Sequence, residues 1–309
     1  LAGPEGPRTA GGAAWAPAAA LGAAALAAAG ALGQGRRGKA ARCETVASAP
    51  VPAAAASPSL GAKCLAEALG TGIVVHGGCG VVAASKYCGS GINTGQAALV
   101  WGLSVALAVY ATRDVSGAHL NPAITASLAV NKPDALPRGE VAPYVLSQLL
   151  GATVAGAVNY LVCRRGIAAL EKAQGIVRGA AASAASYSGA FGMTPNLSLV
   201  SPLGALALEV WMTAVFAFLV FAATDSENTV PEAAAPALIG ATVAVLISTF
   251  GPITGCGMNP ARDLGPRLVT AVAGWGGAAL CSWWVYTLGP VLGAILGGAA
   301  YQAMLAQKK

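Results

Sequence analysis

The tripeptide Asn-Pro-Ala occurs twice in this sequence, beginning at Asn121 and again at Asn259. Asn is among the best residues for a helix cap, and Pro is tolerated in the first helical turn because an N–H there has no helical partner. Each tripeptide therefore predicts a helix start with an amide side chain at its positively polarised end. Arg262 and Asp263 follow the second tripeptide directly, so that helix start also carries a fixed cation and an acid.

The rest of the chain is too apolar for a soluble domain. Of its 309 residues, 56% are hydrophobic and 10% are charged, whereas soluble domains carry about 25% charged residues. Six apolar runs have about the length that a membrane-spanning helix needs, and none shows the short alternating pattern of a membrane barrel. The runs are 64–84, 96–112, 141–162, 202–223, 235–250 and 280–305. The predicted class is an all-α membrane protein with six transmembrane helices.

The two tripeptides lie inside two copies of one unit. Short segments too brief to cross a membrane, "SGAHLNPAITASLAV" and "TGCGMNPARDLGPRLV", follow the second and the fifth apolar run. When Asn121 is aligned with Asn259, the same register also matches Gly117 to Gly255. The flanking runs repeat as well, and their alignment matches Glu67 of the first run to Glu209 of the fourth. Two matching frames of this kind indicate internal duplication.

Counting the crossings gives the topology. Each unit contains three full crossings, an odd number, so the second unit enters the membrane from the opposite side and the repeats are inverted. Each tripeptide opens a helix of about ten residues, about 15 Å long, which is half the hydrocarbon thickness. The two half-helices are therefore expected to meet near the midplane. The channel domain would span 63–305, with repeat one at 63–162, a loop at 163–201, repeat two at 202–305 and a tail at 306–309.

The expected meeting point suits a neutral, hydroxyl-bearing solute. Each helix start carries about half a positive charge, and the Asn amides add N–H donors, so cations are repelled and oxygen lone pairs are accepted. The backbone carbonyls before each half-helix are expected to stay free to accept hydrogen bonds from hydroxyls. They belong to Gly117, Ala118, His119, Leu120, Gly255, Cys256, Gly257 and Met258. The alternative is that both Asn residues only cap buried helices, but helix starts at membrane depth favour a water-lined cavity.

At these motifs the chain resembles the major intrinsic protein (aquaporin) family, and within it the aquaglyceroporin or glycerol facilitator branch. The two segments "SGAHLNPA" and "GMNPARDLGP", together with "AEALGTG" and "ALVWGLSVALAVY", carry the resemblance, which covers about residues 63–305. It implies the aquaporin-like fold of six helices and two half-helices, and a homotetramer in which each chain holds its own pore. By the same resemblance Asn121 and Asn259 match the paired pore asparagines, and Glu67 and Glu209 match glutamates that brace the two loops.

The resemblance also implies a selectivity filter. Arg262 matches the filter arginine and Trp101 the aromatic that packs the carbon edge of a polyol, while Asp263 is typical of glycerol-conducting members. Where water-selective members carry a histidine this chain has Ile247, and where a second filter aromatic is expected it has Cys256. We expect a passive channel for glycerol and other small neutral polyols that also passes water, with urea as a further candidate solute, and that excludes protons and ions. The alternatives are a water-selective aquaporin and a non-conducting structural member of the family.

Other classes of function find little support in the sequence. The net charge of +6 is spread over connections and forms no basic face with aromatics, so nucleic acid is not an expected partner. The seven cysteines form no CxxC pair, which indicates apolar fillers rather than a disulfide framework or a zinc site. No acid–base pair or nucleophile suggests an enzyme, and no cofactor is expected. Arg267 is expected at the membrane interface, and His76 in the core or facing the pore.

The segment 1–62 differs from the rest of the chain. It is rich in Ala, contains "GRRGKAAR", and resembles a secretory or organelle-targeting leader. A disordered tail and an extra membrane helix are the alternatives. The expected location is a membrane, either the plasma membrane or that of an organelle such as a plastid, with the lipid bilayer as the surrounding partner.

Overall fold

The computed structural model describes residues 57–306, which are helical throughout their regular parts. The predicted leader therefore lies outside the described residues, apart from its last few, as does most of the predicted tail. The long helices are α2 (Leu60–Cys88), α3 (Thr94–Ser116), α5 (Arg138–Gln174), α7 (Pro202–Ala223), α8 (Ala235–Thr254) and α10 (Val285–Ala306). The short helices and helical turns are α4 (Pro122–Asn131), η1 (Ala181–Ser183), α6 (Ala184–Tyr187), η2 (Glu232–Ala234), α9 (Pro260–Thr270), η3 (Ala271–Trp275) and η4 (Gly276–Leu280).

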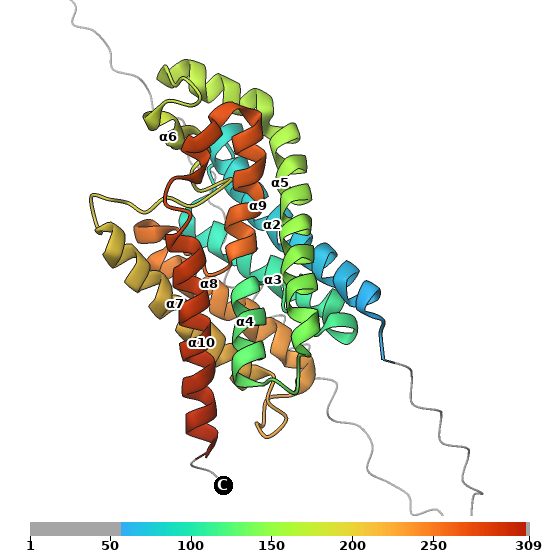
Figure 1. The fold of residues 1–309 in the computed structure, drawn as a ribbon. Helices are drawn as coiled ribbons and strands as arrows, with labels where there is room; N and C mark the ends of the chain where they lie inside the picture. The colour runs from blue at the N-terminus through green and yellow to red at the C-terminus, as the bar shows by residue number, and fades with distance from the viewer. Residues whose placement is uncertain (1–56, 307–309) are drawn as a thin grey trace, which may run out of the picture. The chain divides into compact units, whose positions relative to one another are not determined.

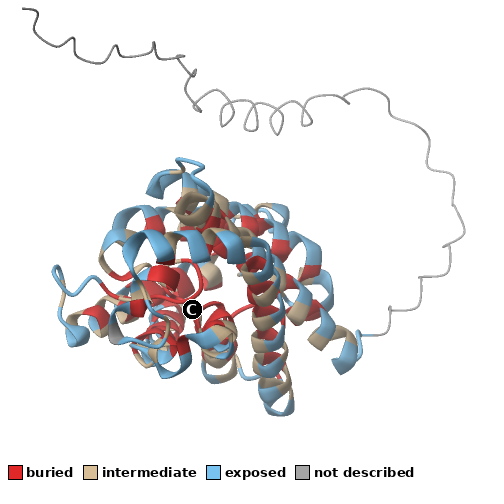
Figure 2. Ribbon diagram, turned by 90° about the horizontal axis from the view of Figure 1, so that it is seen from above, coloured by how far each residue is buried: buried red, intermediate tan, exposed pale blue. Residues whose placement is uncertain are grey.

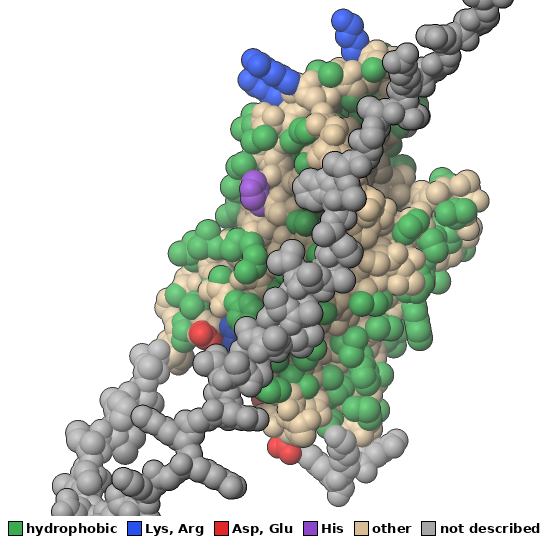
Figure 3. Space-filling view, turned by 180° about the vertical axis from the view of Figure 1, so that it is seen from behind, with side chains coloured by type: hydrophobic (Ala, Val, Ile, Leu, Met, Phe, Trp, Pro, Cys, Tyr) green, Lys and Arg blue, Asp and Glu red, His purple; other side chains and the backbone are tan. Residues whose placement is uncertain are grey.

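The helices turn apolar side chains outward. Six of them are long and apolar enough to cross a membrane. On α3 the leucines Leu99, Leu103 and Leu107 are 55%, 53% and 63% exposed, and their four-residue spacing puts them on one stripe. On the face seen in Figure 3, hydrophobic side chains cover much of the height, and the acidic and basic side chains lie toward its two ends. Such a surface matches lipid, so the chain is an integral, multi-pass membrane protein.

The two repeats pack in the same way, as the duplication predicted. In repeat one, α2 lies against α5 so closely that a Cβ on Gly151 would be 1.9 Å from the carbonyl oxygen of Ala68. In repeat two, α7 lies against α10, and a Cβ on Gly293 would be 2.3 Å from the carbonyl oxygen of Val210. In the alignment of the repeats, Gly293 matches Gly151 and Val210 matches Ala68. Glycine at these positions lets the helix backbones touch, which is how membrane helices gain contact area.

The half-helices α4 and α9 fill the centre of the bundle. In Figure 1 they lie one above the other, their first residues facing each other. They contain 10 and 11 residues, as the half-membrane length requires. Seen from above, buried residues gather in the interior and exposed residues on the outer sides of the helices (Figure 2). The predicted fold of six membrane helices with two half-helices in inverted repeats is therefore confirmed.

Two helix boundaries differ from the sequence prediction by more than the few residues seen at the others. The third apolar run was expected to end at residue 162, but α5 continues to Gln174 because Ile167 and Glu171 are buried in contacts beyond the membrane run. The sixth run was expected to begin at residue 280, but α10 begins at Val285, since Ser282 has a φ of 60° that interrupts a helix. The segments 175–201 and 271–284 lie at the end of the bundle where α5 ends and α10 begins, and we refer to them together as the cap.

Candidate functional site

The segments before the two half-helices, 117–120 before α4 and 255–258 before α9, have an irregular backbone, and the irregularity is the same in both. We call these two segments the approaches. Before α4, Ala118 and Leu120 have φ values of 51° and 52°, and before α9, Cys256 and Met258 have φ values of 53° and 49°. Residues other than glycine rarely adopt this left-handed region, which costs about 1–3 kcal/mol each and persists where the surroundings enforce it. The same strain therefore occurs in both copies of the unit, directly before each half-helix.

Two buried carboxylates hold these strained segments. Glu67 on α2 accepts the backbone N–H groups of the two residues before Asn121, at 2.9 and 2.7 Å. Glu209 on α7 accepts those of the two residues before Asn259, both at 3.0 Å. Neither glutamate is exposed to solvent. Because their N–H groups are bound to the carboxylates, both approaches are held in an irregular, non-helical form without unsatisfied backbone donors at these positions.

The two Asn residues cap their own helices and reach across to the opposite approach. Asn121 Oδ1 accepts from the N–H of Ala123 at 2.9 Å, and Asn121 Nδ2 donates to the carbonyl of Met258 at 2.8 Å. Asn259 Nδ2 donates to the carbonyl of Leu120, also at 2.8 Å. An amide nitrogen carries two N–H groups, so each Asn keeps one for a molecule in the centre of the protein.

This crossing corrects one detail of the sequence prediction. The carbonyls before each half-helix were expected to be free, but those of Leu120 and Met258 accept the Asn amides. The remaining members of the predicted set contribute to the lining of the cavities on either side of the centre, Gly117, Ala118 and His119 on one side and Gly255, Cys256 and Gly257 on the other. The crossing uses one lone pair of each occupied carbonyl, since a carbonyl oxygen has two.

Four adjoining cavities pass through the molecule. The cap-side mouth has a volume of about 220 Å³ and shares Trp101, Ile247 and Arg262 with a constriction of about 40 Å³. The constriction shares both Asn residues with a central cavity of about 50 Å³, which opens into a wide mouth of about 550 Å³ at the opposite end. The residues common to the constriction and the central cavity are Val74, Val105, Asn121, Phe216 and Asn259. The protein therefore contains a narrow passage with a wider mouth at each end.

The constriction has one apolar wall and one charged wall. Trp101, Ile247 and Cys256 line it, and all three are at least nine-tenths buried. The guanidinium carbon of Arg262 lies 4.2 Å from the centre of the Trp101 ring. Arg262 is only 3% exposed, and its Nη1 has no hydrogen-bond partner in the described part of the chain. A buried, unpartnered cationic donor is costly unless a polar molecule visits it.

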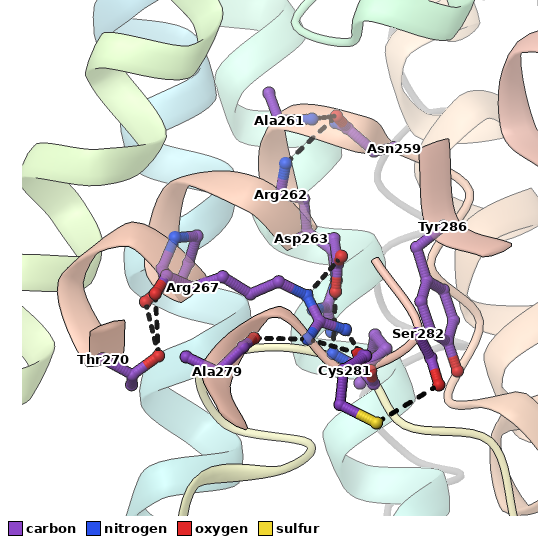
Figure 4. A network of polar contacts seen from close by, with 12 residues as sticks. Asn259, Ala261, Arg262, Asp263, Arg267, Thr270, Ala279, Cys281, Ser282 and Tyr286 are labelled. Atoms are coloured by element: carbon purple, nitrogen blue, oxygen red, sulfur yellow. Dashed lines mark hydrogen bonds and ion pairs between the residues drawn. The ribbon is translucent and has the colours of Figure 1, made fainter. Parts of the chain in front are cut away.

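Asp263 does not line any of these four cavities. Its Oδ2 accepts from Arg267 Nε at 2.6 Å, and both side chains are completely buried. Figure 4 shows Arg267 extended between Asp263 and the carbonyls of Ala279 and Cys281, which accept from its Nη1 at 2.7 and 2.9 Å. Asp263 Oδ1 also accepts the N–H of Met193 at 2.7 Å. The pair therefore ties α9 to both segments of the cap.

The expectation for Arg267 at the membrane interface was wrong, and so was that for His76. Arg267 is not exposed at all, because the cap covers the end of α9 and supplies carbonyls for its guanidinium. His76 is exposed on the outer side of α2 and neither joins the core nor lines the four cavities. A single helical residue in an apolar run gives no sign of its direction, which only the packing of neighbouring helices decides.

Two residues that shape the passage gave no signal in the sequence. Gly78 on α2 lies against Trp101, and a Cβ there would be 2.1 Å from the indole ring. Met193 lies in the cap and lines the cap-side mouth. The run "HGGCG" shows a local excess of glycine, but nothing in it identifies Trp101, which stands on the next helix, as the partner of Gly78.

Comparison with known proteins agrees with this geometry. A family model described as "Major intrinsic protein" matches residues 54–301. The chain belongs to the major intrinsic protein family. Among curated members of the family, a glycerol uptake facilitator protein of Haemophilus influenzae is 43% identical over 251 residues, covering 79% of this chain and 94% of that protein. A glycerol uptake facilitator protein of Pseudomonas aeruginosa is 40% identical over 262 residues, covering 82% of this chain and 92% of its own.

A solved structure of the family has the same fold. The aquaglyceroporin from Plasmodium falciparum superimposes with a TM-score of 0.70, covering 81% of this chain and 98% of that one. The two sequences are 24% identical, so this likeness concerns the fold alone. The fold of this chain is thus shared with that aquaglyceroporin.

Proposed function

We propose that the chain is a passive, bidirectional channel for glycerol and other small neutral polyols, and that it also passes water. This proposal rests on the constriction. One of its walls is apolar and the other is charged, just as a polyol has a carbon edge and a hydroxyl edge. Trp101 and Ile247 offer an apolar surface to a carbon chain, and the unpartnered Nη1 of Arg262 offers a donor to hydroxyl oxygens. The glycerol uptake facilitators at 43% and 40% identity support the same solute class.

Beyond the constriction, the paired asparagines donate hydrogen bonds to the hydroxyl groups of the solute. Asn121 and Asn259 each have one remaining N–H, and both residues line the constriction and the central cavity, so these groups can donate to a solute there. Glu67 and Glu209 act as braces that hold the approaches, and hence the asparagines, in place. Asp263 acts indirectly, because it fixes α9 and the cap rather than contacting the solute.

The same arrangement opposes ions and protons. Helices α4 and α9 aim their N-termini at the centre, each equivalent to about half a positive charge, which raises the energy of a cation there. A water molecule that accepts from both asparagines has its oxygen lone pairs engaged, so it cannot receive a proton from its neighbour. Transport of neutral solutes, with no enzymatic step, is the activity that these groups support.

Flux measurements on the full chain in lipid vesicles test the proposal. Vesicles with and without the protein are exposed to inward gradients of glycerol and, separately, of the larger polyol sorbitol, and light scattering follows the swelling. We expect fast glycerol entry and slow sorbitol entry. Fast water flux without glycerol entry would make the protein a water-selective aquaporin, and no flux of either would make it a structural member.

The assembly and the location belong to the same proposal. His76 is exposed midway along α2, and an ionisable group facing lipid is costly, so burial between copies would relieve it. This supports the homotetramer implied by the family resemblance, which native mass spectrometry in detergent tests. The Ala-rich, Arg-bearing leader at 1–62 supports an organelle membrane such as that of a plastid, with the plasma membrane as the alternative. Imaging the tagged full chain beside one lacking the segment 1–62 distinguishes them.

A further inference from the structure

The cap end of the bundle exposes basic side chains and, in the described part of the chain, no acidic ones. Its exposed basic residues are Arg164, Arg165 and Lys172, all on α5. The exposed acids of the described part belong to the opposite end, in or beside the α3–α4, α4–α5 and α7–α8 connections. They are Asp114, Asp134, Glu227 and Glu232. On the face seen in Figure 3, Lys and Arg side chains project from the upper end, where no acidic side chain is visible.

The three basic side chains have no counter-charge within residues 57–306. None of them takes part in an ion pair there. The acid that stands next to Lys172 in the sequence is Glu171, which is buried and turned toward the cap. Its carboxylate accepts from Arg178 Nε at 2.9 and 3.0 Å and from Ser186 Oγ at 3.2 Å. The charges of the three residues are therefore available to a partner outside the chain.

Two of these residues continue the lipid-facing side of α5. Val158 and Leu161 are exposed apolar side chains of this helix. Arg165 follows Leu161 by four residues and Lys172 follows Arg165 by seven, so they lie on the same side, while Ile167 on the other side is completely buried. At 1.5 Å per residue, Arg165 lies about 6 Å beyond Leu161. The headgroup layer of a bilayer is about 5–7 Å thick, so this arginine reaches that layer.

The cap presents exposed apolar side chains beside the end of α5. Val177 and Val272 are 72% and 91% exposed. Arg178 joins their segments to the helix, because its Nε donates to Glu171 and its Nη1 donates to the carbonyl of Ala273 at 2.8 Å. Apolar side chains next to basic ones are typical of surfaces that lie at the boundary between headgroups and hydrocarbon. This combination favours a bilayer over a soluble anion as the partner.

We propose that the end of α5 binds the headgroups of anionic phospholipids through Arg164, Arg165 and Lys172. The lipid phosphate lies against their guanidinium and ammonium groups, and the acyl chains lie along the apolar side chains of the preceding turns. Zwitterionic lipids carry no net charge and should bind more weakly. The binding does not depend on which solute the central passage carries.

Native mass spectrometry of the full chain in a neutral detergent tests the proposal, with phosphatidylglycerol and phosphatidylcholine of identical acyl chains as probes. We expect the wild type to prefer phosphatidylglycerol. R165Q should weaken its binding about fivefold, and the triple variant R164Q/R165Q/K172Q about 100-fold, with phosphatidylcholine binding unchanged. The matched control R138Q, which removes an exposed arginine from the opposite end of the same helix, should bind as the wild type. Thermal unfolding checks that the variants fold as the wild type.

Photo-cross-linking in a bilayer tests the location. Phosphatidylglycerol with a diazirine close to its headgroup is mixed into vesicles of phosphatidylcholine that contain the protein, and the labelled peptides are identified by mass spectrometry. We expect label at residues 161–172 in the wild type and its loss in the triple variant. Equal binding of the two lipids, an equal loss of binding in R138Q and R165Q, or full competition by soluble glycerol phosphate would overturn the proposal.

Discussion

The contact between Gly78 and Trp101 allows a sharp test of the constriction. In G78A the new Cβ would lie 2.1–2.2 Å from three atoms of the indole ring, whereas ordinary contact begins at 3.4 Å. The ring must therefore shift by about 1 Å, and it also contacts Arg262, whose guanidinium carbon lies 4.2 Å from the ring centre. The available space is the constriction itself, of about 40 Å³. We expect the ring to narrow the passage.

The size of the effect follows from the cost of overpacking. Forcing an extra carbon into a packed site costs about 1–3 kcal/mol. If a glycerol molecule must restore the original ring position to pass, that energy adds to its barrier and lowers its permeation about 5- to 150-fold. Water is smaller and should be slowed less. Stopped-flow light scattering of vesicles reconstituted with equal amounts of protein measures both rates.

The same helix offers a matched control. In G80A the new Cβ would meet only the Asn159 side chain, at 3.8 Å or more, so flux should stay as in the wild type. Adding W101F to G78A removes part of the displaced ring and should restore glycerol entry. Wild-type glycerol permeation by well-folded G78A would refute the reasoning, because Trp101 would then not define the constriction.

Three further variants test the polar groups. R262A should widen and depolarise the constriction, so that sorbitol enters vesicles faster relative to glycerol, and unchanged selectivity would place Arg262 outside the filter. E209Q loses a charged acceptor for two backbone N–H groups, so its free energy of unfolding should fall by about 2–3 kcal/mol. Denaturation in detergent measures this change, with E209D, which keeps the carboxylate, as the control. D263N leaves Arg267 buried without its counter-charge, which should lower the free energy of unfolding by about 3–5 kcal/mol. If the ion pair is the cause, adding R267M to D263N should recover part of that loss.

Local chemistry allowed much of this protein to be predicted from its sequence. Run length and low charge indicated membrane helices, and Asn-Pro-Ala indicated helix starts, because both depend on residues close together in the chain. Duplication with three crossings in each unit then required inverted repeats, whatever the packing. The central meeting of α4 and α9 followed from that count.

The tertiary structure alone decided which distant residues meet. Helices in contact along their whole length bring together side chains far apart in sequence, so the partner of a residue depends on how its neighbours rotate and pack. Arg267 was expected at the membrane interface and is instead enclosed by cap carbonyls. Gly78 proved to be the residue against which the Trp101 ring packs. These contacts are set by three-dimensional packing, which no local pattern in the sequence encodes.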